Sequence, residues 1–237
     1  MSALSELQHH LTRYWALPYH QDSTLNDTLN EVQTWQRARI RRTHSALFEQ
    51  PKNQPMASYF LTQLYGGDEF KVLAKQLERI LPKAKKLERL AKESALETGT
   101  MAIQAAILAI ELDMHLAQWL IAQNLPINEE NMLAAYRGID ESAERYAQIS
   151  HLKEVCYRTD KYLNSFVLRK AFDFSKGAAY RHNYQPLYDF IDAGFHAMKP
   201  LKSVGNFIDS FCVRETKFIE QIHAADNDGN LSAFTVS

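Results

Sequence analysis

Apolar residues recur along the chain at intervals of three and four positions, the spacing of one face of an α-helix. No convincing run alternates apolar and polar residues with the period of two that a half-buried strand requires. The eight glycines and seven prolines fall mostly where such helical segments would end. The pattern predicts an all-α protein, a single bundle of roughly eight to ten helices. We expect residues 1–225 to form one domain and residues 226–237 a flexible tail, with two coupled helical halves as the alternative organisation.

The longest predicted helix covers residues 94–124 and contains the most apolar stretch of the chain, "MAIQAAILAIEL". Glu111 and nearby polar residues interrupt this stretch, which falls short of the ~20 apolar residues needed to cross a bilayer. We therefore expect it to be the central core helix of a soluble protein. Further helices are predicted from a cap at Asn128, over residues 148–172, and from Pro200 onward, and Asp68 is a good N-cap for another.

Two carboxylates occupy the apolar faces of predicted helices. At 100° per residue, Asp113 falls among the alanines and leucines of the 94–124 helix. Glu215 lies near the centre of the apolar stripe of the last helix, and Arg214 lies at the edge of that stripe. A buried carboxylate is costly unless it is paired or hydrogen-bonded. The pattern predicts a buried ionic network that fixes helix register, and the alternative is a pair of ligand-binding or catalytic carboxylates.

Two other charged patterns have simple structural interpretations. The arginines of "RARIRR" at residues 37–42 are spread around a helix, which predicts a solvated face with one or two buried ion pairs. Glu111 and His115 are four positions apart and could ligate a metal, but they fit the solvent edge of the long helix, and we expect no metal site.

Composition excludes several functional classes. Apolar residues make up 46% and charged residues 23% of the chain, which argues against disorder, and a net charge of −1 provides no global attraction to nucleic acid or an anionic membrane. No phosphate-binding glycine loop, catalytic serine elbow or Cys-x-x-Cys pair is present, and we expect no cofactor. Cys156 and Cys212 are far apart, which favours two buried thiols in a reduced, cytoplasmic setting.

The stretch "YFLTQLYGGDEF" at residues 59–70 resembles the signature of the FFLEELY-motif proteins, a family of uncharacterised bacterial proteins. The blocks "WQRARIRRTHSALFEQP" and "FIDSFCVRETKFIEQI" are similar to two other recurring blocks of that family. The resemblance implies a cytoplasmic all-α protein with no assigned activity, and it draws attention to Tyr65, Asp68, Arg214 and Glu215 as motif positions. In this chain Thr62 and its neighbour replace the two acidic residues of the motif, which weakens any chemical role for those acids.

These observations favour a cytoplasmic, non-enzymatic helical protein that acts through protein contacts, with a homodimer among the expected partners and no role in binding nucleic acid or membranes. The alternative is an enzyme or sensor that binds a small ligand between helices. Its pocket would lie near Asp113 and Glu215, with Tyr65 and Arg214 as further candidate ligand-binding residues.

Overall fold

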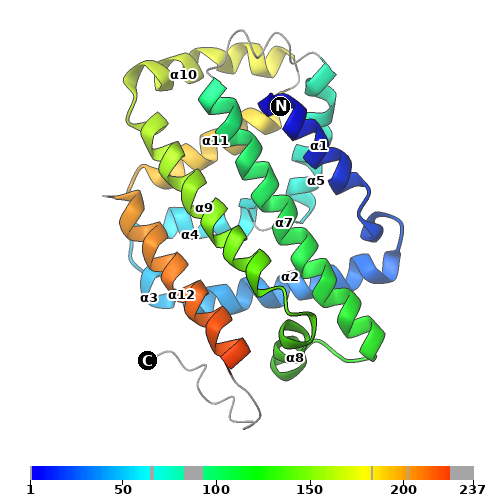
Figure 1. The fold of residues 1–237 in the computed structure, drawn as a ribbon. Coiled ribbons are helices and arrows are strands. Elements are labelled where there is room, and N and C mark those ends of the chain that lie inside the picture. The colour runs from blue at the N-terminus through cyan, green and yellow to red at the C-terminus, as the bar shows by residue number, and fades with distance from the viewer. Residues whose placement is uncertain (1, 65–66, 83–92, 183, 202, 225–237) are drawn as a thin grey trace.

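The structure, a computed structural model, describes residues 2–64, 67–82, 93–182, 184–201 and 203–224. Within these ranges the chain forms eleven α-helices, a short 3₁₀ helix and one π-helical turn, with no strand (Figure 1). The elements are α1 (Ala3–Trp15), η1 (Pro18–His20), α2 (Ser23–Thr43), α3 (Ser45–Phe48), α4 (Gln54–Tyr59), η2 (Phe60–Leu64), α5 (Asp68–Ile80), α7 (Glu93–Gln123), α8 (Glu129–Ile139), α9 (Ser142–Leu163), α10 (Phe166–Arg181), α11 (Gln185–Met198) and α12 (Val204–Ala224). The predicted all-α class is therefore confirmed. Tyr65 and the expected tail at residues 226–237 lie outside the described ranges.

Helix α7 is the central element, as the sequence predicts. It packs against α1, α2, α8 and α9, and its apolar residues form much of the larger core cluster. Its segment Leu96–Ala122 is long and apolar enough to cross a membrane by length and composition, and 67% of the most apolar window is buried in the protein. The core helix of a soluble protein meets the same criteria, so the burial of α7 accounts for its composition.

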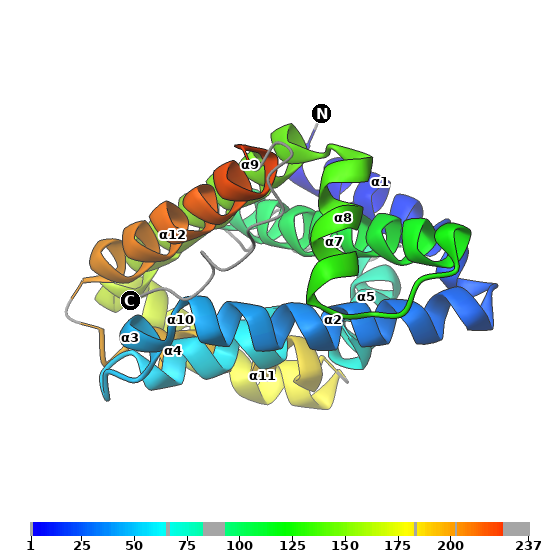
Figure 2. The ribbon, with the colours of Figure 1, turned by 90° about the horizontal axis from the view of Figure 1, so that it is seen from below.

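The core consists of two hydrophobic clusters that share helices. The larger one surrounds α7 and includes residues of α1, α2, α5, α8 and the C-terminal part of α12. The smaller one joins α3, α4, η2 and α11 to the N-terminal part of α12, with one residue each from α2 and α9. Figure 2 shows α2 crossing the molecule, with α7, α8, α9 and α12 on one side and α4 and α11 on the other. Helices α2 and α12 contribute to both clusters, so these two helices hold the clusters together.

Two predicted helices differ from those in the structure, and in each case a serine accounts for one changed boundary. The single helix expected at residues 148–172 is broken into α9 and α10, because Ser165 adopts an extended backbone and its side chain accepts a hydrogen bond from the backbone N–H of Leu168. The last helix begins at Val204 instead of Pro200, and the Ser203 hydroxyl accepts a hydrogen bond from the N–H of Asn206. With this additional break, the described residues contain eleven α-helices, slightly more than the predicted eight to ten.

Other local predictions are confirmed or refined. Asn128 caps α8 by accepting a hydrogen bond from the N–H of Asn131 at 2.9 Å. Asp68 is the first residue of α5 instead of its N-cap, and Gly67 occupies the capping position with φ of 88°, a left-handed conformation that favours glycine. Phe60 and Leu61 are buried in the smaller core cluster, and they begin the π-helical turn η2.

Candidate functional site

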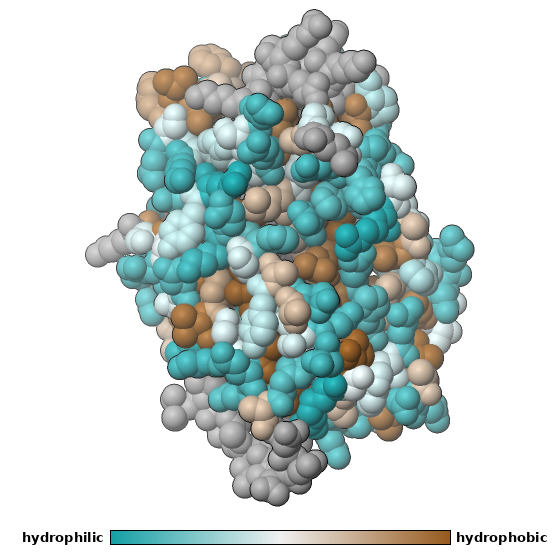
Figure 3. All heavy atoms as spheres, in the orientation of Figure 1, coloured by the Kyte–Doolittle hydropathy of each residue, from teal (hydrophilic) through white to brown (hydrophobic). Residues whose placement is uncertain are grey.

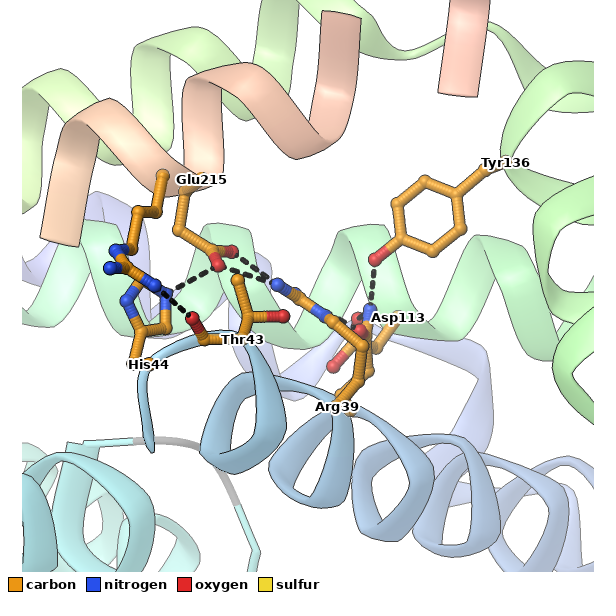
Figure 4. A network of polar contacts seen from close by, with 8 residues as sticks. Arg39, Thr43, His44, Asp113, Tyr136 and Glu215 are labelled. Atoms are coloured by element: carbon orange, nitrogen blue, oxygen red, sulfur yellow. Dashed lines mark hydrogen bonds and ion pairs between the residues drawn. The ribbon is translucent and has the colours of Figure 1, made fainter. Parts of the chain in front are cut away.

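A buried ion pair joins α2 to α12. Arg39 Nη1 donates hydrogen bonds to both carboxylate oxygens of Glu215, at 2.5 and 2.7 Å, and His44 Nε2 lies 2.7 Å from Glu215 Oε1 (Figure 4). All three side chains are buried, and His44 is completely inaccessible to solvent. The predicted buried ionic network is therefore present at Glu215.

The sequence of α2 and α12 explains why these polar groups meet inside the core. Helix α2 ends at Thr43, so His44 lies in the short link to α3 while Arg39 is in the last turns of α2. Aromatic rings enclose both groups. The Arg39 guanidinium lies 4.1 Å from the centroid of the Phe218 ring, and the His44 ring stacks on Phe211 with a centroid distance of 4.3 Å. These contacts hold the cation and the imidazole in position and exclude water from the ion pair.

Asp113 is connected to this ion pair indirectly. Gln36 Nε2 donates a hydrogen bond to Asp113 Oδ1 at 3.0 Å and another to the Tyr136 hydroxyl, while Gln36 Oε1 accepts a hydrogen bond from Arg39 Nη2 at 3.3 Å. The two acids thus belong to one polar network without touching each other. The network links α2, α7, α8 and α12, which is consistent with a role in fixing helix register.

Sequence reasoning missed Gln36 and His44 as members of the network. A signal for Gln36 was available, because it continues the buried stripe of α2 after Leu29 and Val32, where a polar side chain requires a partner. For His44 no comparable signal exists, since its burial depends on where α2 stops.

Arg214 is not part of the Glu215 ion pair, although the two residues are adjacent in the sequence. Its Nη1 donates a hydrogen bond to the backbone carbonyl of Thr43 at 2.9 Å, at the C-terminal end of α2. The last carbonyls of a helix lack intrahelical donors, so Arg214 caps α2 and does not line a pocket with Glu215. The remaining candidate, Tyr65, lies outside the described residues.

The electrostatics of the network fix its protonation state. Burial alone would raise the pKa of Glu215, but Arg39 and His44 outweigh this effect and hold the pKa at about 2. Burial lowers the pKa of His44, against the opposing influence of Glu215. Near neutral pH Glu215 is therefore ionised and neutral His44 donates its Nε2 proton to it. A carboxylate with so low a pKa is a poor general base near neutral pH.

Two surface cavities lie away from the buried network. One of about 200 Å³ lies between Asn53 of the α3–α4 link and Asn206 of α12, and one of about 260 Å³ lies where α9, α10 and α11 meet. Neither is lined by Asp113, Arg214 or Glu215. The candidate acids consequently have no access to these cavities.

Glu111 differs from its predicted position at the solvent edge of the long helix. It is buried, and it accepts a hydrogen bond from Arg13 Nε at 2.6 Å, because α1 packs over this side of α7. His115 Nδ1 lies 2.5 Å from Glu141 Oε1, so the two side chains that could have shared a metal face separate partners. The part of the chain that the structure describes contains no group of three or more potential metal ligands.

The three sequence blocks that carry the motif resemblance pack against one another. Phe60, from the block at residues 59–70, makes edge-to-face contacts with Phe207 and Phe211, at centroid distances of 5.6 and 5.4 Å. Both phenylalanines belong to the block that contains Glu215, and the third block supplies Arg39 and His44. The three blocks therefore share one interior contact region of this protein.

Among the residues that the structure describes, the three most exposed large hydrophobic side chains lie on α10, which contributes no buried residue. Phe166 and Val167 are each 73% exposed and Phe174 is 85% exposed. In Figure 3 hydrophobic surface is visible at the upper left, where Figure 1 places α10. A helix whose aromatic side chains face solvent is unusual for an isolated soluble protein and is typical of an interaction surface.

Comparison with known proteins identifies a family without assigning an activity. A family described as a domain of unknown function (DUF8198) matches residues 16–229. No curated protein and no solved structure matches the chain. Because the match covers nearly the whole sequence and includes all the residues of the buried network, this protein belongs to the DUF8198 family.

Proposed function

We propose that the protein is a non-enzymatic cytoplasmic helical protein that acts through contacts with other proteins. The observation that carries this proposal is the solvent-exposed aromatic face of α10, where Phe166 and Val167 are each 73% exposed and Phe174 is 85% exposed. Aromatic side chains are enriched at protein interfaces and often provide the anchoring contacts.

The alternative, a small ligand bound near Asp113 and Glu215, has lost its main support. The carboxylate of Glu215 is fully engaged by Arg39 and His44, and Asp113 accepts a hydrogen bond from Gln36. A ligand would have to displace these contacts from a buried region that neither described cavity reaches. The energetic role of the network is therefore better assigned to holding the helices together.

A reduced compartment is supported by the two cysteines. Cys156 and Cys212 are both free and buried, and burial raises the pKa of the Cys156 thiol to about 12. Such thiols are unreactive, so they serve as small apolar side chains in the core. We also propose a relationship to the FFLEELY-motif proteins, which is supported by the mutual packing of the three blocks around Phe60, Phe211 and Glu215.

The proposal can be tested by comparing the chain in its own cells with the purified chain. The tagged protein in a gentle extract should elute well above its monomer mass of 27.3 kDa. Light scattering on the purified protein then separates self-association from a complex with another protein. A monomer in both preparations, combined with a melting-temperature rise of several degrees with one metabolite class, would replace the proposal with the ligand-binding alternative.

A further inference from the structure

We propose that the outward face of α10 is a docking surface for an acidic, amphipathic protein segment, one that carries carboxylates between apolar side chains. This inference rests on the proposed function and names the chemical class of the partner. The outward face is defined by Phe166, Val167, Lys170, Phe174 and Arg181, all of which are exposed.

The helical geometry separates this face from the side that holds α10 on the protein. Phe172, on the opposite side of the helix, stacks on Tyr188 of α11 at a centroid distance of 4.3 Å and makes an edge-to-face contact with Phe195 at 5.0 Å. Phe166, Lys170 and Phe174 follow one another at intervals of four residues, so they form a row on the other side. The helix is thus anchored through Phe172 while this row remains free to contact a partner.

The charge of α10 indicates the sign of its partner. Four basic residues and a single acidic one lie on the helix, which makes α10 net +3 within a chain of net charge −1: Arg169, Lys170, Lys176, Arg181 and, as the acid, Asp173. All of them are exposed. In the described part of the chain, no ion pair joins any of the four cations to a carboxylate. Two of these cations, Lys170 and Arg181, belong to the outward face, which contains no carboxylate, so an acidic partner would complement it.

The arrangement of charge within the face favours an acidic protein over an anionic membrane. In a helix that lies in a membrane interface, the apolar face is separated from the cationic face. Here Lys170 lies between Phe166 and Phe174, and its Nζ is 5.8 Å from the Phe166 ring centroid, so insertion of the aromatic rings into lipid would also draw in the cation. A protein partner can instead place a carboxylate opposite Lys170 and apolar groups opposite the two rings.

The same charges argue against pairing with a second copy. Two α10 faces brought together would place Lys170 and Arg181 of one copy opposite the same two cations of the other, and like-charge contacts across an interface are costly. A single helix of 16 residues presents a face about 24 Å long, which corresponds to the smaller, transient class of protein interfaces. We therefore expect a complex that forms and dissociates readily.

Site-specific photocrosslinking in the cells that express the protein tests this proposal. Phe174 is replaced in the full chain by the photoreactive analogue p-benzoylphenylalanine, and Val213 on α12 receives the same replacement as the matched control, since it is 55% exposed at a site outside α10. Irradiation should produce a protein adduct at position 174 that is absent at position 213. Mass spectrometry of the adduct should place the crosslink in an acidic segment of another protein.

Charge variants of α10 test whether formation of the adduct depends on opposite charges on the face and its partner. The double change Lys170→Glu and Arg181→Glu should reduce the adduct at position 174 by about fivefold or more, since two favourable charge pairs are lost and two repulsive ones are created. Lys170→Arg with Arg181→Lys should preserve it. A charge reversal away from the face, Lys52→Glu with Lys75→Glu, is the control for the change in net charge, since both lysines are exposed.

Each other outcome overturns the inference in an identifiable way. A crosslink between two copies of the chain assigns the face to self-association, and a lipid or nucleic-acid adduct assigns it to those partners. An adduct at position 174 that persists in the charge-reversed variant contradicts the proposal that the partner segment is acidic. A protein adduct at position 213 without one at 174 contradicts this inference while leaving the proposed function intact, whereas the absence of protein adducts at both positions contradicts both.

Discussion

Arg39 Nη1 lies 2.5 and 2.7 Å from the two carboxylate oxygens of Glu215, although the two residues are 176 positions apart in the chain. Their contact joins α2 to α12, the two helices that contribute to both core clusters. Because both side chains are buried, each requires the other to offset its loss of hydration. Several measurable consequences depend on this pair and on the helices around it.

Glu215→Gln should destabilise the protein by ~3–5 kcal/mol, since it leaves the Arg39 guanidinium buried without a counter-charge. Urea denaturation measures the loss. Glu154→Gln is the control, because Glu154 pairs with Arg158 on the exposed surface of α9 and its loss should leave the denaturation midpoint almost unchanged. The double variant Arg39→Met with Glu215→Leu should regain most of the stability. Equal midpoints for the wild type and Glu215→Gln would contradict the role of the ion pair.

Acid should remove the contribution of Glu215 in a defined pH window. The folded-state pKa of about 2 is lower than the ordinary value of 4.5, so the stabilisation is complete above pH 4.5 and is lost as the pH falls toward 2. The shift corresponds to roughly 3 kcal/mol. Stability measured in urea at intervals from pH 5 to 2.5 should therefore fall more steeply for the wild type than for Glu215→Gln. Parallel curves would show that the carboxylate is not held in its ionised form.

His44 should add a second pH dependence at higher pH. Its folded-state pKa is lowered from 6.5 by burial, so the unfolded chain binds a proton that the folded protein excludes, and stability falls as the pH drops below 6.5. His44→Gln keeps a donor within reach of Glu215 but does not titrate. The stability difference between the wild type and this variant should therefore shrink between pH 7.5 and 5.5. His196→Gln, at an exposed position of α11, is the matched control, and identical profiles for all three proteins would refute the prediction.

Gly194 should be intolerant of even one added methyl group. An alanine Cβ at this position of α11 would lie 2.9 Å from the Tyr59 hydroxyl oxygen, whose proton is donated to the Phe190 carbonyl. We expect Gly194→Ala to cost roughly 1–3 kcal/mol in thermal unfolding. Gly99→Ala in α7, where the added Cβ would meet no described side chain within 4 Å, should instead gain about 0.5–1 kcal/mol.

A second substitution tests the cause of the Gly194 effect. Tyr59→Phe removes the hydroxyl oxygen that the new methyl group would meet, so Gly194→Ala should cost less in the Tyr59→Phe background than in the wild type. Equal costs in both backgrounds would mean that the clash is with another group.

The periodicity of apolar residues was sufficient to predict the all-α class and the central position of α7. It also predicted that the carboxylates Asp113 and Glu215 lie on apolar helix faces. These features depend on spacing along one helix, which the order of residues determines directly. The separation of α9 from α10 was not predicted, because one side-chain hydrogen bond at Ser165 outweighs a helical pattern that continues through it.

What the tertiary structure alone decided is which residues become neighbours. The sequence placed Glu215 on an apolar face and supplied many arginines, but only the crossing of α2 and α12 selects Arg39 as its partner and His44 as its second donor. Glu111 is buried against Arg13 because α1 packs on α7. Phe174 is exposed because α10 packs on α11 through its opposite side. Local spacing determines which face of a helix is apolar, whereas the position of that face in the folded protein depends on contacts between residues far apart in the chain.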